Sequence, residues 1–219
     1  MNEKAIVHVI DDDESVRSAL QLLLQTVDLE ARSYESVQQF LDTAAYDGPG
    51  CIVLDVRLPG ISGLDFQKQL TALGIRLPVV LMTGHGDVAM SVRAMKAGAV
   101  DFLPKPFRDQ DMIDAVSSAI EHDRQRRVAD EEVTRIRGHF GRLSPREQQV
   151  MMLVTAGKNN KQVAGDLSLS EITVKIHRGH AMRKMCARTL VDLVHMADAA
   201  NLRDLERVSF RCDWRQSLG

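Results

Sequence analysis

The feature that most constrains this chain is an alternation between a short apolar run and an amphipathic stretch, which recurs five times over its first half. The apolar runs occupy residues 6–10, 29–33, 51–54, 79–82 and 99–103. Each is followed by apolar residues at helical spacing, as at Val16, Leu20 and Leu24. Strands that are apolar throughout are typical of a parallel sheet covered by helices on both faces. The expected fold class is therefore α/β, with a doubly wound five-stranded parallel sheet.

The second half of the chain has a helical pattern throughout. Residues 121–141 are crowded with charges and lack proline, which favours a helical linker extending out of the first domain, with a disordered connector as the alternative. Ser144 and Glu147 flank a proline in the pattern of a capped helix start, and Gly157 ends that helix. Ser170 begins another helix, rich in Lys and Arg, and a last one covers residues 190–200. Two helices joined by a tight turn, the second basic, indicate a helix-turn-helix.

The predicted domains are residues 1–121, a helical linker at 122–141, an all-α helix-turn-helix domain at 142–204 and a tail at 205–219. Their charges differ. Residues 1–120 carry 10 Lys and Arg against 17 Asp and Glu, whereas residues 121–219 carry 18 against 13. An acidic half followed by a basic half suggests that the second half meets a polyanion.

The cysteines and the apolar segments bear on the cellular compartment. Cys51, Cys186 and Cys212 are widely spaced, which offers neither a disulfide framework nor a CxxC metal site and fits a reducing compartment. The sequence has no apolar run of 18 residues and no signal-peptide pattern at its start. We expect a cytoplasmic protein that does not associate with a membrane.

Polar residues stand where four of the predicted strands end. They are Asp11, Asp12, Asp13, Asp55, Thr83 and Lys105. Parallel strands bring their carboxyl ends to one rim of the sheet, so these side chains should converge there. Clustered carboxylates repel one another unless a hard cation such as Mg²⁺ lies between them. A lysine and a hydroxyl beside them would cradle a phosphoryl group, and an aspartate there can attack phosphorus to form an aspartyl phosphate. Taken singly, each residue has a plainer interpretation, as a helix cap or as a solvated strand end.

Two other classes of phosphate-handling domain do not fit the sequence. Phosphatases of the haloacid-dehalogenase type need a second acid two positions after the nucleophilic aspartate, and that position holds Arg57. A nucleotide-binding domain would need GxGxxG or GxxxxGK[ST] after a strand, and neither motif is present.

The motifs in both halves resemble those of a known family. Residues 9–13 (VIDDD), 54–60 (LDVRLPG), 82–86 (MTGHG) and 102–107 (FLPKPF) are similar to the receiver domain of two-component response regulators, which has a flavodoxin-like fold. Residues 143–147 (LSPRE), 160–164 (NKQVA) and 173–178 (TVKIHR) are similar to the LuxR-type helix-turn-helix. The resemblance covers about residues 4–200 and places the chain in the FixJ/NarL branch of response regulators.

The resemblance implies roles for the acidic residues of the first domain. Asp55 would be the phosphoacceptor. Asp11 and Asp12 would hold Mg²⁺ together with Asp55 and the backbone carbonyl of Arg57. Asp13 falls outside the acidic pair of the family, so we interpret it as the cap of the first helix.

Three further positions match the family. Thr83 would hydrogen-bond the phosphoryl group, and Lys105 would pair with it. Phe102 occupies the aromatic switch position, although an ordinary core phenylalanine explains it equally well from the sequence. We also expect Arg57 and His85 to influence how long the acyl phosphate lasts.

Helical spacing sorts the residues of the basic helix into two faces. Val174, His177, Ala181 and Met185 should face the domain, whereas Lys175, Ile176, Gly179 and Arg183 should face outward. Lys175 suits guanine O6 and N7, and Ile176 suits a thymine methyl. Phosphate contacts are expected from Lys161, Thr173, Arg178, Arg183 and Lys184. A basic helix in a protein-binding module is the alternative.

The expected function is a regulator of transcription that is switched by phosphorylation. Its partners would be a sensor histidine kinase, double-stranded promoter DNA, a second copy of the chain after phosphorylation and, as a further candidate, RNA polymerase. It would not be an enzyme that releases a product, although the receiver would catalyse its own phosphoryl transfer and dephosphorylation. The alternative is a regulator controlled by protein contacts, in which phosphorylation is vestigial.

Two apolar sets are candidates for contacts between copies. One, on the fourth helix and fifth strand of the sheet domain, comprises Val92, Met95, Ala97, Ala99 and Val100. The other, on the final helix, comprises Leu190, Leu193, Val194 and Ala197.

Overall fold

A computed structural model describes residues 4–46, 48–84 and 88–202 of the 219-residue chain. The chain divides into two compact units, Met1–Val128 and Ala129–Gly219, and each is described by itself. His85 and the tail from residue 205, with Cys212, lie outside the described residues. Among the helices that are described, none is long and apolar enough to cross a bilayer.

The first unit confirms the predicted α/β fold. Its strands are parallel and lie in the order β2-β1-β3-β4-β5. The strands are β1 (Ile6–Ile10), β2 (Glu30–Tyr34), β3 (Gly50–Asp55), β4 (Val79–Thr83) and β5 (Asp101–Pro104). The helices between them are α1 (Glu14–Gln25), α2 (Val37–Thr43), α3 (Gly63–Gln69) and α4 (Val88–Lys96), and α5 (Asp109–Phe140) follows the last strand.

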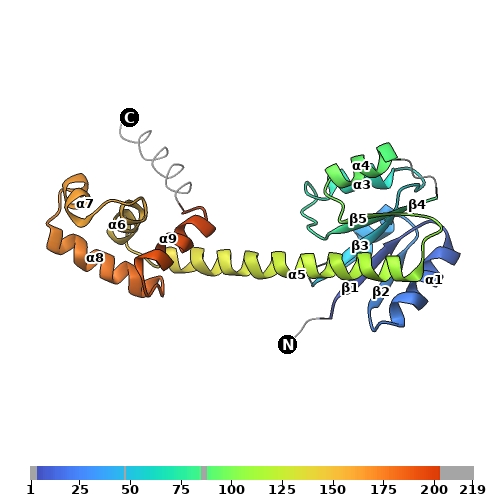
Figure 1. The fold of residues 1–219 in the computed structure, drawn as a ribbon, viewed down its shortest axis with the longest axis horizontal. Helices are drawn as coiled ribbons and strands as arrows, with labels where there is room; N and C mark the ends of the chain where they lie inside the picture. The colour runs from blue at the N-terminus through green and yellow to red at the C-terminus, as the bar shows by residue number, and fades with distance from the viewer. Residues whose placement is uncertain (1–3, 47, 85–87, 203–219) are drawn as a thin grey trace. The chain divides into compact units, whose positions relative to one another are not determined.

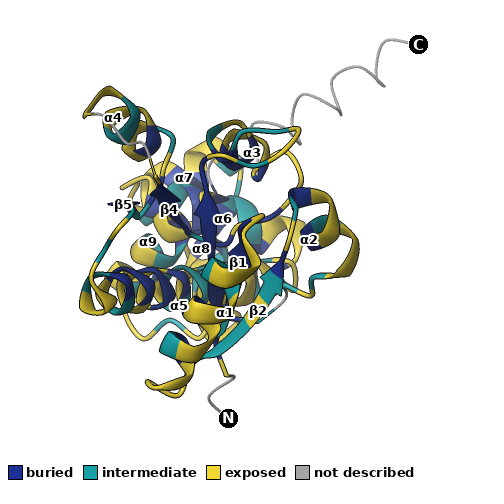
Figure 2. Ribbon diagram, turned by 90° about the vertical axis from the view of Figure 1, so that its right-hand side faces the viewer, coloured by how far each residue is buried: buried dark blue, intermediate teal, exposed yellow. Residues whose placement is uncertain are grey.

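Alternating side chains of the sheet form two apolar cores. Val7, Val9 and Val53 point to the face that α1 and α5 cover, whereas Ile52 and Leu54 point to the face covered by α2, α3 and α4. Figure 1 shows α3 and α4 on one side of the sheet and α1 and α5 on the other. The strands of the middle of the sheet are buried on both faces, as Figure 2 shows, which explains why they are apolar throughout.

The first unit extends past the boundary expected at residue 121, because a carboxylate of α5 is bound to the sheet. Asp123 is buried, and its Oδ2 accepts a hydrogen bond of 3.1 Å from the backbone N–H of Gly50. Arg127 Nε donates to the same oxygen at 2.7 Å, and its guanidinium also bonds to the carbonyl of Gly48. These contacts hold α5 against the sheet beyond residue 121, so the division falls after Val128.

The segment expected to be a linker is helical, as predicted, but its second part packs into the second unit. Ile136 is buried in a core of that unit, and Val133 and Phe140 pack against the same core. Arg137 donates hydrogen bonds of 3.3 and 3.2 Å to the carbonyl of Ala200. Residues 129–140 of α5 are therefore part of the second unit rather than a free connector.

The second unit contains the predicted short helices. They are α6 (Pro145–Thr155), α7 (Asn160–Leu167), α8 (Glu171–Lys184) and α9 (Leu190–Ala199). The capping box of Ser144 and Glu147 is formed, and Gly157 follows α6 with a φ of 91°. Ser170 caps α8 by accepting from the backbone N–H of Thr173 at 3.1 Å.

The core of the second unit corrects one expectation about the final helix. Leu193 and Ala197 are fully buried against α6 and α8, so they are not available for contact with a second copy. Leu190 is 41% exposed and Val191 is 60% exposed, so the free apolar surface of α9 lies at its start.

Candidate functional sites

The sheet register brings the predicted polar residues together at one rim of the first unit. Ile10 pairs with Leu54 across β1 and β3, so Asp11 and Asp55 leave neighbouring strands at the same level. Thr83 pairs with Pro104 across β4 and β5, which places Lys105 beside the end of β4. The residues that the alternation alone placed at strand ends therefore meet in space.

One ammonium group joins the two buried carboxylates. Lys105 Nζ lies 2.7 Å from Asp11 Oδ2 and 2.9 Å from Asp55 Oδ1. The backbone N–H of Lys105 donates to the carbonyl of Thr83 at 2.7 Å, which fixes the start of its side chain. Asp11, Asp55 and Thr83 are buried, whereas Lys105 is half-buried. The buried part of the rim thus holds two carboxyl groups and one hydroxyl, with a half-buried lysine between the carboxyl groups.

The charges of this cluster act on one another. Burial raises the pKa of Asp55, and the negative charge of Asp11 raises it further, against the opposing effect of Lys105. Burial alone would lower the pKa of Lys105, but its bonds to Asp11 and Asp55 outweigh that cost and raise its pKa. One ammonium does not neutralise two carboxylates, so the cluster retains an affinity for further positive charge.

The backbone around the acids is held by local hydrogen bonds. Asp55 Oδ2 accepts from the backbone N–H of Arg57 at 2.7 Å. Asp11 Oδ1 accepts from the backbone N–H of Asp13 at 2.9 Å, and Asp13 caps α1 by accepting from Ser15 at 2.8 Å, as predicted. Of the four carboxylate oxygens of Asp11 and Asp55, two face Lys105 and two are used by the chain itself.

Arg17 has a role here that the sequence did not suggest. Its Nη1 donates to the backbone carbonyls of Asp11 and Asp12 at 2.8 and 3.0 Å, so the first helix holds the acidic loop from behind. The only signal in the sequence was an arginine in the second turn of the helix that Asp13 caps.

Gly63, at the start of α3, lies directly behind the Asp55 backbone. A Cβ built on it would stand 2.2 Å from the carbonyl oxygen of Asp55, closer than any real contact. Its N–H donates to the carbonyl of Val56 at 3.0 Å. A residue without a side chain is therefore needed for the chain to pass so close to the strand end.

The expected metal ligands fall into two groups. Asp11 and Asp55 are buried and share Lys105, whereas Asp12 is exposed and lines, with Arg57, a cavity of about 1000 Å³ beside the rim. Among the described residues no three acidic or other metal-binding side chains are already grouped around one point. The donors are nevertheless all oxygens with excess negative charge, and this donor set suits Mg²⁺.

Phe102 and α4 lie next to this rim. Phe102 is half-buried and packs against the core under α2, α3 and α4. This position suits both an aromatic switch residue and an ordinary core phenylalanine. On α4, Val88, Val92 and Met95 are 80%, 46% and 48% exposed. Ala99 is buried, so the free apolar surface is carried by α4 itself rather than by the whole predicted set.

In the second unit, α8 has the two faces that its sequence predicted. Val174, Ala181 and Met185 are fully buried and His177 is half-buried. The residues that face outward are Lys175, Ile176, Gly179 and Arg183. Ile172, which sequence reasoning missed, is 74% exposed one turn before Ile176, and this makes two free isoleucines on the basic face.

The other residues expected to contact phosphates differ in their exposure and in whether their polar groups already bind another residue of the domain. Lys161, at the start of α7, is exposed, and Thr173 is half-buried with its hydroxyl 2.8 Å from that of Ser170. Arg178 donates to Asn160 Oδ1 at 3.2 Å, a bond that ties α8 to α7. Lys184 Nζ lies 2.6 Å from Glu147 Oε2, so its charge is engaged within the domain.

Glu147 connects α6 to α8. Burial opposes its charge, but the ammonium of Lys184 and the hydrogen bonds at Ser144 outweigh burial and hold the pKa of Glu147 at about 2. One oxygen, Glu147 Oε2, thus accepts from the backbone N–H of Ser144 at the start of α6 and pairs with Lys184 at the end of α8, the helix that carries the basic face.

Known protein families match both units. The family described as response regulator receiver domain matches residues 7–117, and the family described as bacterial regulatory proteins, luxR family, matches residues 142–197. Nodulation protein W of Bradyrhizobium diazoefficiens is 53% identical over 199 residues, which cover 91% of this chain and 88% of that protein. Transcriptional regulatory protein FixJ of Azorhizobium caulinodans is 46% identical, with 90% of this chain and 93% of that protein covered.

Solved structures of response regulators are also similar to this chain. Response regulator StyR is 44% identical with a TM-score of 0.76, over 89% of this chain and 98% of that one. Full-length FixJ from B. japonicum is 38% identical with a TM-score of 0.54, over 91% and 98% of the two chains.

Proposed function

Because the chain belongs to the two-component response regulators, with a receiver and a LuxR-type DNA-binding domain that regulates transcription, we propose that Asp55 is its phosphoacceptor. The observation that carries this proposal is the single ammonium of Lys105 between Asp11 and Asp55, beside the buried Thr83. Of Asp11, Asp12 and Asp55, only Asp55 combines a contact to Lys105 with a position next to the cavity-lining Arg57.

The chemistry follows from the position of each group. An Asp55 carboxylate oxygen attacks phosphorus of a phosphohistidine on a partner kinase, the O–P bond forms, and the P–N bond breaks to return the imidazole. Lys105 offsets negative charge that the phosphoryl oxygens bring, and the Thr83 hydroxyl donates to one of them. Mg²⁺, held by Asp11, Asp12, Asp55 and the Arg57 carbonyl, would supply further positive charge for these oxygens. We propose that the activity of the chain is confined to its own phosphorylation on Asp55 and to hydrolysis of the resulting acyl phosphate, which returns the carboxylate and inorganic phosphate.

Intact-mass measurement with acetyl phosphate and Mg²⁺ tests the proposal. One phosphate, labile to hydroxylamine, is expected on the native chain and none on Asp55→Asn. Asp13→Asn is the matched control, because this exposed carboxylate caps α1 and does not contact Lys105. Equal labelling of Asp55→Asn, or undiminished labelling in EDTA, would show that another group accepts the phosphate.

The output would be binding of promoter DNA in the cytoplasm by the exposed face of α8, strengthened when two copies associate. The apolar stripe of Val88, Val92 and Met95 on α4 is the surface that favours such association. A dimer brings two helix-turn-helix domains to paired half-sites, so dimerisation and DNA binding must strengthen each other.

Sedimentation with and without a beryllofluoride phosphoryl mimic checks this second step. We expect a monomer that becomes a dimer and binds its operator at least about tenfold more tightly. A dimer of unchanged affinity in both states would contradict the mechanism. A persistent monomer with improved DNA binding would contradict it too, and would indicate release of an inhibitory contact.

A further inference from the structure

The cavity beside the rim is larger than phosphoryl transfer requires. It measures about 1000 Å³ and lies within the first unit, between the loop after β3, α3 and α4. Clefts that bind small organic molecules measure roughly 300–1000 Å³. Asp12 and Arg57 form the end next to the rim, and the remaining lining residues have no part in the chemistry described above.

Much of the wall of this cavity is apolar. Its apolar side chains include Val56, Leu58, Leu64, Met90 and Ala97. Ala94 is the one residue of α4 that is buried, and Met90, Arg93, Lys96 and Ala97, in and directly after this helix, line the cavity. Figure 2 shows the exposed surface of α4. Met90 is half-buried at the wall, and its flexible thioether can adapt to the outline of a ligand.

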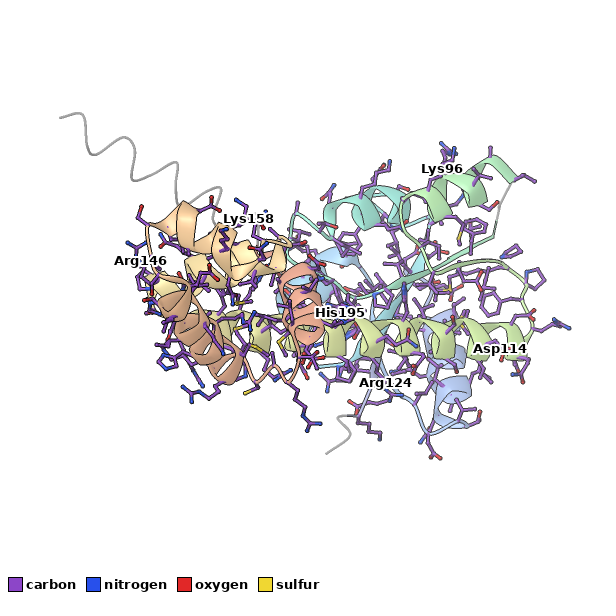
Figure 3. All side chains as sticks on the ribbon, turned by 60° about the vertical axis from the view of Figure 1, so that its left-hand side comes forward. Lys96, Asp114, Arg124, Arg146, Lys158 and His195 are labelled. Carbon is purple, nitrogen blue, oxygen red and sulfur yellow. The ribbon has the colours of Figure 1, made fainter. Side chains whose placement is uncertain are left out.

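The same cavity carries an excess of positive charge. Lys68 is neutralised by Asp65 at 2.9 Å, but Arg57, Arg93 and Lys96 form no ion pair with any residue that the structure describes. All three are exposed, and Figure 3 shows Lys96 on α4. Three unpaired cations beside an apolar wall fit a ligand that has an anionic group and an apolar body. An inorganic anion would not use the wall, and an uncharged hydrocarbon would not use the cations.

We propose that this cavity binds a small amphipathic carboxylate, with its body against Leu64 and Met90 and its carboxylate toward Arg93 and Lys96. The site goes beyond the function proposed above, because occupancy needs neither a phosphoryl donor nor Mg²⁺. Arginine and lysine at the mouth would form charge-assisted hydrogen bonds with the carboxylate, and burial of the ring or alkyl chain supplies the rest of the affinity.

Methyl NMR of the ¹³C-methionine-labelled full chain tests the site directly. Benzoate and hexanoate are the probes, each titrated against its uncharged analogue, benzamide or hexanol. The Met90 methyl resonance should shift and saturate with a dissociation constant of about 1 mM or lower for the acids. Met95 on the same helix, Met112 in the opposite core and Met151 in the second unit are internal controls that should not move.

Variants separate the site from unspecific attraction. Arg93→Ala combined with Lys96→Ala should weaken benzoate binding at least about tenfold. Arg32→Ala, which removes an exposed cation of β2 outside the cavity, should not change it. The proposal is overturned if Met90 does not respond to the acids or if benzamide matches benzoate. It is equally overturned if inorganic phosphate shifts Met90 as strongly, or if the double variant binds as the native chain does. All these measurements are made without phosphorylation, so failure of the Asp55 assignment would not affect them.

Discussion

Protonation of one buried histidine should make the receiver less stable in mild acid. His8 lies on β1, is 1% exposed, and has its Nδ1 3.0 Å from the Tyr34 hydroxyl. Its ring packs against Tyr34 and Phe40, with centroids 5.8 and 5.4 Å away. Burial, assisted by the positive charge of Arg32, lowers the pKa of His8 from 6.5 to about 4.

The size of the effect follows from the two pKa values. A histidine with a lowered folded-state pKa binds protons more readily when unfolded, so stability is complete above pH 6.5 and falls as the pH drops toward 4. Because proton binding by His8 is linked to unfolding, this pKa shift lowers the free energy of unfolding by about 2 kcal/mol between pH 7 and pH 5. The total loss below pH 4 is about 3 kcal/mol.

Urea unfolding at pH 7 and pH 5 measures this loss. Tyrosine signals report on the first unit, because both tyrosines, Tyr34 and Tyr46, lie there. His8→Gln keeps an amide that can bond to Tyr34 but does not titrate, so its stability should lose about 2 kcal/mol less than the native chain on going to pH 5. His122→Gln, at an exposed position of α5, should behave as the native chain does. An equal loss in His8→Gln and the native chain would refute the reasoning.

Four further outcomes are expected. Arg57→Ala should change the lifetime of the phosphorylated form while changing folding stability by less than about 0.5 kcal/mol, because the side chain is exposed; an unchanged hydrolysis rate would contradict this. In filter-binding titrations, Lys175→Ala should reduce the binding free energy for the preferred DNA site by about 1–3 kcal/mol. Arg183→Ala should instead weaken binding to all DNA sequences alike and reduce the slope of log affinity against log salt concentration by about 1. Glu147→Gln should destabilise the second unit by about 2–3 kcal/mol at pH 7, as hydrogen exchange of α6 would measure. The native chain keeps this stabilisation by the Glu147 carboxylate above pH 4.5 and loses it as the pH falls toward 2. Asp123→Ala should cost about 3–5 kcal/mol in urea unfolding of the first unit, because it leaves the guanidinium beside it half-buried without its carboxylate.

The strands and the rim could be predicted because both depend on local pattern. The sequence predicts the first strand at residues 6–10, as observed, because an apolar run of this length is stable in the interior of a parallel sheet that helices cover on both faces. Asp55, Thr83 and Lys105 were found because parallel strands must end at a common edge. Caps such as Asp13 and Ser144 act within four residues, so they too are visible in the sequence.

The parts that escaped prediction depend on contacts between distant residues. Asp123 moves the domain boundary by bonding to Gly50, 73 residues earlier, and nothing in a charge-rich helix indicates which acid will be buried. The ion pair of Lys184 with Glu147 could not be predicted, because the two residues are 37 positions apart in the sequence. Leu193 was expected on the surface because helical spacing identifies an apolar face but not what covers it.

Gly63 limits how this receiver can diverge in evolution or be modified by design. With any side chain at that position overlapping the Asp55 carbonyl, even alanine would displace the residue that we propose to accept the phosphate. Variation in signalling speed must therefore come from neighbours with room to change. Arg57, exposed two residues after Asp55, is such a neighbour, so a family of regulators can share one rigid support and still differ in how long each signal lasts.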